Sequence, residues 1–148
     1  QIFLVSIDKI GLYRQKVIPQ VNPADSKDYE KALQMGVAQA KGTAFPWQEK
    51  MVYIFGHSTN YPWFVKDLNA LFFKLETLTT GDKIEIEYNS KLFNYYVVQK
   101  KVVKATEVEV IKENVDKDIL VLQTCYPPGT FWKRLLIFAK PSKFAGLI

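Results

Sequence analysis

A succession of short strand-like segments along almost the whole chain is the feature that most constrains the fold. Residues 83–88 alternate polar and apolar side chains, which is the pattern of a strand with one buried face. Residues 51–55 are apolar without alternation, as expected for a strand that is covered on both sides. Further strands are predicted at residues 2–7, 12–19, 93–104, 118–124 and 134–139.

These strands predict an all-β architecture. About seven or eight strands with only short helices favour mostly antiparallel pairing in a sandwich or a closed barrel. A closed barrel has the advantage that it leaves no free strand edge. The length of 148 residues fits one domain, so we expect residues 1–148 to form a single unit. Within it, Pro19 is expected to end the second strand, and residues 105–117 look irregular.

Two short helices are also expected. The first can be capped by Asp25 or Ser26 and stopped by Gly36, with apolar residues along one face between them. The second is predicted at residues 64–72, where apolar side chains recur at helical spacing. Gly81, followed by an aspartate, marks a turn.

The basic residues argue against a nucleic-acid partner. The net charge is +5, and all but two of the 20 basic residues are lysines; the exceptions are Arg14 and Arg134. Proteins that read nucleic acids rely on arginine for bidentate and stacking contacts. Scattered lysines are more typical of a solvated surface, although they are compatible with attraction to an anionic envelope polymer or membrane surface.

Three residues at predicted strand ends form a candidate catalytic set. His57, the sole histidine, follows strand 51–55, the sole cysteine, Cys125, ends strand 118–124, and Arg134 opens the next strand. If the last two strands form a hairpin, Cys125 faces Arg134 with Cβ atoms about 4.5–5.5 Å apart. A nearby histidine or cation favours the nucleophilic thiolate, and a guanidinium can hold an oxyanion or orient a substrate backbone. The alternative interpretation is a buried cysteine, a capping histidine and a surface arginine.

One cysteine and one histidine also limit other chemistry. An internal disulfide framework is impossible, and a structural zinc site, which needs about four such ligands, is not expected.

Six segments resemble motifs of the sortase family, and they occur in the family's order. They are Ile7-Asp-Lys-Ile-Gly11, Met35-Gly-Val-Ala38 with Gly42-Thr-Ala44, Phe55-Gly-His57-Ser-Thr59, Leu75-x-x-Leu-x-x-Gly81-Asp82, Val121-Leu-Gln-Thr-Cys125 and Lys133-Arg134-Leu-Leu-Ile137. The resemblance covers nearly the whole chain.

This resemblance implies a closed eight-stranded sortase barrel and a cysteine transpeptidase. It makes Cys125 the nucleophile, His57 the general acid and base, and Arg134 the group that orients the substrate or stabilises an oxyanion. The implied substrate is an Leu-Pro-x-Thr-Gly-like sorting signal of a secreted surface protein. Its acyl half would pass through a thioacyl enzyme to an amine of a cell-wall precursor or a pilin lysine. No metal or organic cofactor is implied.

The resemblance also implies a location and a subclass. The domain is expected at the extracytoplasmic face of the membrane, anchored by a segment outside this sequence. The short loop between Cys125 and Arg134 resembles that of compact-loop sortases rather than the housekeeping class. Some relatives bind calcium near residues 40–50, but this stretch offers only Glu49, so no calcium site is expected.

Four residues beside the nucleophile are candidates for substrate binding, and two of them have simpler explanations. Thr124 can pack within its strand and Trp132 can fill core. Gln123 occupies a position that is often apolar in the family, which leaves the peptide preference open. The full set is Gln123, Thr124, Tyr126 and Trp132.

Other functions are compatible with parts of the pattern. Papain-like peptidases place cysteine before histidine, whereas here His57 comes first. L,D-transpeptidases share the order of histidine before cysteine, but they carry a Ser/Thr-x-Gly-Cys-type signature, which the segment Gln123-Thr-Cys125 does not fit. A non-catalytic, lysine-rich barrel that binds an anionic cell-envelope polymer is the alternative from another class, and it would make Cys125 a core residue.

Overall fold

The fold is an eight-stranded closed barrel in a computed structural model that describes residues 2–56, 72, 74–105, 109–126 and 133–142. The expected helix at 64–72, apart from Phe72, and the loop with Pro127 lie outside these residues. The strands are β1 (Phe3–Ile7), β2 (Leu12–Val21), β3 (Val37–Ala40), β4 (Val52–Phe55), β5 (Lys83–Tyr88), β6 (Lys91–Lys104), β7 (Leu120–Tyr126) and β8 (Lys133–Pro141). The helices are α1 (Ser26–Met35) and α2 (Glu109–Asn114), with 3-10 turns η1 (Asp8–Ile10), η2 (Pro46–Gln48) and η5 (Leu75–Thr77).

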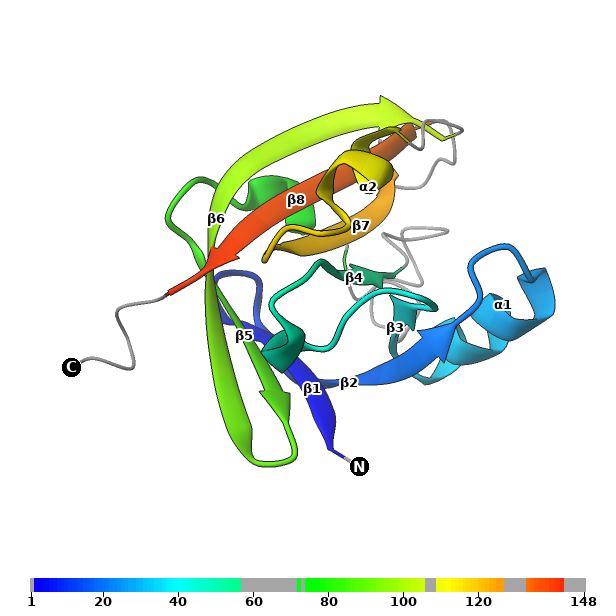
Figure 1. Cartoon of the computed structure of the whole chain (residues 1–148), viewed down its shortest axis with the longest axis horizontal. Helices are drawn as coiled ribbons and strands as arrows, with labels where there is room; N and C mark the ends of the chain where they lie inside the picture. The colour runs from blue at the N-terminus through cyan, green and yellow to red at the C-terminus, as the bar shows by residue number, and fades with distance from the viewer. Residues whose placement is uncertain (1, 57–71, 73, 106–108, 127–132, 143–148) are drawn as a thin grey trace.

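The strands follow one another around the barrel in the order β1-β2-β3-β4-β7-β8-β6-β5 (Figure 1). Two neighbouring pairs are parallel, β2 with β3 and β4 with β7. The other pairs are antiparallel, so the predicted barrel with mostly antiparallel pairing is confirmed. The parallel pair of β4 and β7 brings together two segments that are far apart in the sequence.

Apolar side chains form two clusters, one on each side of the barrel wall. The interior cluster fills the barrel and includes Val5, Ile54 and Leu122. The outer cluster lies between the wall and the two helices and includes Val121 and Phe138. Strands β4 and β7 contribute to both clusters, which explains why their sequences are apolar without alternation.

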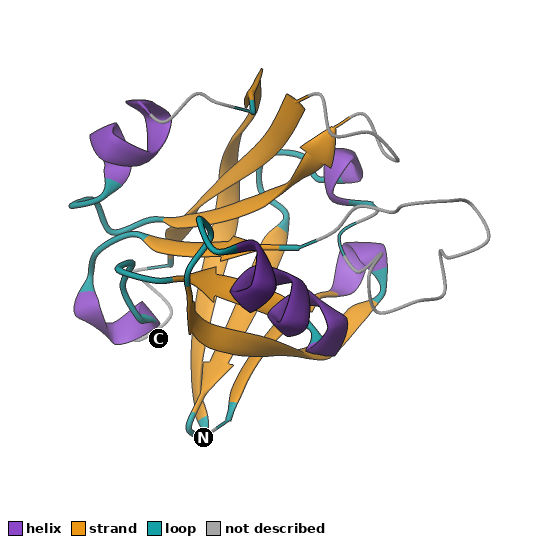
Figure 2. Cartoon of the chain, turned by 90° about the vertical axis from the view of Figure 1, so that its right-hand side faces the viewer, coloured by secondary structure: helices purple, strands orange, loops and turns teal. Residues whose placement is uncertain are grey.

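Helix α1 packs across the outside of β2 and β3 and is the helix nearest the viewer in Figure 2. Its predicted N-cap is confirmed, because the Asp25 side chain accepts hydrogen bonds from the backbone N–H groups of Lys27 and Asp28. Gly36 ends the helix as predicted, and the requirement for glycine is steric, since a Cβ atom there would overlap the carbonyl oxygen of Lys16. No helix in the described ranges is long and apolar enough to span a bilayer.

Three local features differ from the sequence-based expectations. Strand β3 was not predicted, because its four residues are all buried and too few to show a period. Helix α2 forms within the stretch expected to be irregular, since packing of Val110 on the outer cluster stabilises a helix too short for a periodic signal. Strand β2 continues past Pro19 to Val21, because the proline falls at a register irregularity where no ladder donor is needed.

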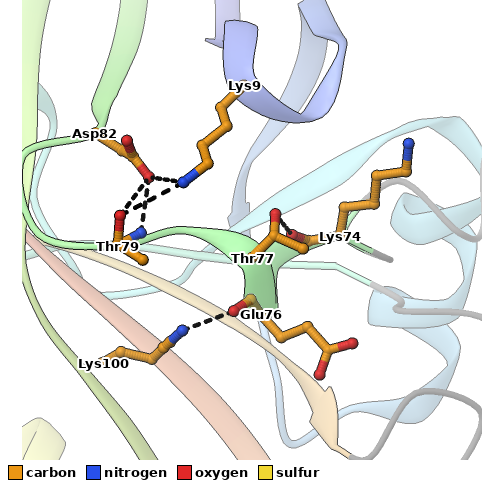
Figure 3. Close-up of polar contacts among 7 residues, drawn as sticks. All are labelled: Lys9, Lys74, Glu76, Thr77, Thr79, Asp82 and Lys100. Atoms are coloured by element: carbon orange, nitrogen blue, oxygen red, sulfur yellow. Dashed lines mark hydrogen bonds and ion pairs between the residues drawn. The ribbon is translucent and has the colours of Figure 1, made fainter.

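Two of the segments quoted above, residues 7–11 and 75–82, are connected by polar contacts at one end of the barrel (Figure 3). Asp82 Oδ2 accepts hydrogen bonds from the backbone N–H of Thr79 at 2.7 Å and from Lys9 Nζ at 2.8 Å. The Lys9 ammonium group holds the pKa of Asp82 below its usual value. Nearby, Lys100 Nζ donates to the carbonyl oxygen of Glu76 at 2.7 Å. The Lys9 contact connects the β1–β2 turn to the turn before β5, and the Lys100 contact connects β6 to η5.

Candidate active site

Cys125 and Arg134 lie directly opposite each other on the antiparallel strands β7 and β8. The predicted hairpin pairing is therefore confirmed, although β7 continues to Tyr126 and β8 begins at Lys133. Opposed side chains in such a pair have Cβ atoms about 4.5–5.5 Å apart. The guanidinium group can consequently reach a group that is bound beside the sulfur.

An open groove of about 650 Å³ lies over these two residues. Its floor is the outer face of β4, β7 and β8, and its walls include residues of α1 and α2. The residues that line it include Tyr29, Glu30, Leu33, Lys41, Thr43, Tyr53, Phe55, Gly56, Ile111, Gln123, Cys125 and Arg134. Cys125 is only partly buried, so its sulfur is accessible to a ligand in the groove.

Burial and charge act in opposite directions on the Cys125 thiol. Partial burial raises the pKa of the thiol, and the positive charge of Arg134 lowers it, with burial the larger effect. Only the thiolate is a useful nucleophile. Among the described residues, Arg134 therefore favours the reactive form and opposes the effect of burial.

The chain leads from the floor of this groove directly to the sole histidine. Gly56 is buried, lines the groove and donates its N–H to the carbonyl oxygen of Gln123 at 3.1 Å. A Cβ atom at this position would lie 2.8 Å from Val37 Cγ1, so the close packing explains why glycine precedes His57. His57 itself lies outside the described residues, and its catalytic role stays a prediction.

Gln123 and Tyr53 form a polar pair on the groove floor. The Tyr53 hydroxyl donates to Gln123 Oε1. Burial raises the pKa of Tyr53, and the charge of Arg134 partly opposes this effect, so the phenol stays protonated. Sequence reasoning missed Tyr53, because a tyrosine in an otherwise apolar strand resembles a core residue. Its hydroxyl was the available signal, since a buried tyrosine usually bonds through it.

Two of the other predicted substrate-binding residues, Thr124 and Tyr126, do not line the groove. Thr124 points to the barrel interior, is 3% exposed, and its hydroxyl has no hydrogen-bond partner among the described residues. Tyr126 packs against the interior cluster. Trp132 lies outside the described residues.

The described residues of the groove include a nucleophile and a guanidinium group. Within the described ranges, no group of three or more histidine, cysteine, aspartate or glutamate side chains is placed to hold a metal ion. Among the described residues that line the groove, Glu30 is acidic and Lys41 and Arg134 are basic. This arrangement suits acyl transfer through a thioester, because the cation can stabilise an oxyanion beside the sulfur.

Comparisons with known proteins agree on one family. A family profile described as Sortase domain matches residues 5–142. Sortase D of Bacillus subtilis (strain 168) is 27% identical over 126 residues, which is 83% of this chain and 57% of that protein. The chain therefore spans little more than half the length of that relative.

Solved structures give the same result. Sortase C1 of GBS pilus island 1 superposes with a TM-score of 0.78 and 27% identity, over 96% of this chain and 64% of that one. Sortase C1 of Streptococcus suis gives a TM-score of 0.76 and 27% identity, over 95% of this chain and 72% of that one. Sortase A of Corynebacterium diphtheriae, at 24% identity and a TM-score of 0.76 over 96% of this chain and 60% of that one, shares the fold.

Proposed function

The chain belongs to the sortase family, and we propose that it is a cysteine transpeptidase in which Cys125 is the nucleophile, with His57 and Arg134 as its catalytic partners. The observation that carries this proposal is the direct pairing of Cys125 with Arg134 on the floor of an open groove. A cysteine that served only to fill the core would not line a groove.

The reaction would proceed in two steps. The Cys125 thiol first gives its proton to His57, and the resulting thiolate attacks the carbonyl carbon of the threonine before the scissile bond in an Leu-Pro-x-Thr-Gly-like signal. The C–N bond breaks, His57 donates a proton to the departing amine, and a thioester forms. An incoming amine then attacks the thioester, gives its proton to His57 and releases the Cys125 thiolate. This is covalent catalysis with ping-pong kinetics.

Arg134 would serve both the nucleophile and the transition state. Its charge lowers the pKa of the Cys125 thiol, which counteracts the effect of burial. Its planar guanidinium group can also donate two hydrogen bonds to one substrate at fixed geometry. A lysine at this position would supply the charge without that geometry.

The substrates and the location follow from the family. We propose that the peptide is the sorting signal of a secreted surface protein and that the acceptor is an amine of a cell-wall precursor or a pilin lysine. Sortases generally act outside the cytoplasm, and we place this one at the extracytoplasmic face of the membrane. The alternative, a polymer-binding barrel, is favoured only by the net charge of +5, and it requires a core position for Cys125, which is instead partly exposed.

Mass spectrometry of the protein with sorting peptides and a soluble amine tests this function. A thioacyl adduct on Cys125 and an amide product are expected with the wild type, and neither is expected with Cys125→Ala. Arg134→Lys should lower kcat/KM by roughly a hundredfold, as for the loss of an oxyanion donor. Arg14→Lys is the matched control, because Arg14 pairs with Glu87 and does not line the groove. Near-normal activity of Arg134→Lys would remove Arg134 from the mechanism.

A further inference from the structure

The groove floor beside the nucleophile is polar where the family often has an apolar residue. Gln123 and Cys125 are two positions apart on β7 and therefore point to the same face of the strand. Both line the groove. An amide at this point can distinguish between substrates, provided that it is held in one orientation.

Tyr53 supplies that orientation. Its side chain is 4% exposed, and its hydroxyl donates to Gln123 Oε1. The Gln123 carbonyl oxygen thereby accepts one hydrogen bond, and no other hydrogen bond of this side chain occurs among the described residues. The two N–H donors of the amide nitrogen are left for a ligand in the groove.

The surroundings make this donor selective. Apolar side chains of Leu33, Phe55 and Ile111 line the same groove. In such surroundings a satisfied hydrogen bond is stronger than in water, and an unsatisfied donor is costly. A peptide that covers Gln123 with an aliphatic side chain would leave the amide unpaired.

The distance along β7 between Gln123 and Cys125 indicates which residue of the peptide contacts Gln123. Positions 123 and 125 are about 6.6 Å apart along β7, the length of about two residues of an extended peptide. Arg134, whose positive charge acts on Tyr53, disfavours a cationic group at this position. The fitting ligand is therefore a neutral or anionic acceptor about two residues from the scissile carbonyl.

We propose that Gln123, held in place by Tyr53, is a specificity-determining residue that selects sorting peptides with a hydrogen-bond-accepting side chain near the scissile bond. Tyr53 is the positioning residue of this pair. The inference rests on the proposed function, because it assigns part of the groove in which Cys125 reacts.

The test compares peptides that differ only by asparagine in place of leucine at one position, with each variable position examined in turn. Asparagine has a comparable size and adds the acceptor. The wild type should prefer asparagine at one position by roughly fivefold in kcat/KM, the effect of one neutral hydrogen bond, and mainly through KM. Gln123→Met, which keeps the side-chain length and removes the donors, should abolish that preference.

Further variants separate positioning from general damage. Tyr53→Phe should weaken the asparagine preference, measured as the ratio of the kcat/KM values for the asparagine and leucine peptides. Tyr95→Phe is the matched control, because Tyr95 is a buried tyrosine that faces the barrel interior, and it should keep the preference. Gln123→Glu replaces donors by acceptors and should shift the preference from asparagine to lysine.

Binding of the same peptides, now labelled with fluorescein, to Cys125→Ala separates this inference from the proposed function. The asparagine preference should persist in the Kd values, although no cleavage is possible. If the ratio of kcat/KM for the asparagine peptide to kcat/KM for the leucine peptide is the same in the wild type and in Gln123→Met at every position, the specificity role is overturned. The transpeptidase proposal would remain intact. A peptide that binds with the expected preference and yields no adduct on Cys125 of the wild type would support the role of Gln123 and contradict the proposed chemistry.

Discussion

The Thr124 side chain offers a test of which face of β7 meets the substrate. Its hydroxyl oxygen is buried inside the barrel without a hydrogen-bond partner among the described residues. A buried polar group that lacks a partner costs about 1–3 kcal/mol. Valine has nearly the same shape and replaces the hydroxyl by a methyl group, so Thr124→Val creates neither a cavity nor a clash. We expect it to raise the free energy of unfolding by about 1–2 kcal/mol.

Urea denaturation followed by circular dichroism measures this change. For a domain of this size, each kcal/mol corresponds to a Tm increase of about 2–4 °C. The m-value should stay constant, which shows that the stability and not the unfolded state has changed. Thr124→Ser is the matched control, since it keeps the hydroxyl, loses one buried methyl group and should destabilise the protein by about 1 kcal/mol.

The same variant addresses the role in substrate binding that the sequence left open for Thr124. Because the side chain points away from the groove, the KM of Thr124→Val for a sorting peptide should match that of the wild type. Lower stability of Thr124→Val would show that the hydroxyl has a partner in the folded protein. A strongly raised KM with unchanged stability would show that it contacts the substrate.

Three other perturbations have definite expected signs. Arg134→Gln should raise the pKa of the Cys125 thiol further and slow its alkylation by iodoacetamide at pH 7; an equal or faster rate would contradict the electrostatic role. Asp82→Asn should lower stability at pH 7 and remove part of its acid dependence, because the depressed pKa of Asp82 stabilises the fold above the unfolded-state value of about 4, and this contribution is lost as the pH falls below it; identical pH profiles of unfolding would refute this. Gly36→Ala should destabilise the protein by at least about 2 kcal/mol in urea denaturation, since its Cβ would overlap a backbone oxygen that cannot move aside, and a neutral effect would show that α1 adjusts.

Local patterns in the sequence were sufficient for much of the barrel. The alternation at β5 predicts a half-buried strand, because the side-chain period of a strand is two and one face is wet. The pairing of Cys125 with Arg134 was also predictable, since consecutive strands joined by a short loop usually pair as a hairpin. The helix α1 was predicted with its cap and its stop, because both signals lie within a few residues of the helix ends.

Only the tertiary structure decided what lies beside the nucleophile. Tyr53 and Gln123 are 70 residues apart, and they meet because β4 and β7 pair in parallel, which no local pattern encodes. Both faces of these strands are buried, so their sequences do not show which side chains point into the barrel and which line the groove. The period of a strand places Gln123 on the face of Cys125 and Thr124 on the other face, and only the structure showed that the face of Thr124 points into the barrel. A sequence records whether a position is covered, whereas the packing of distant segments determines what covers it.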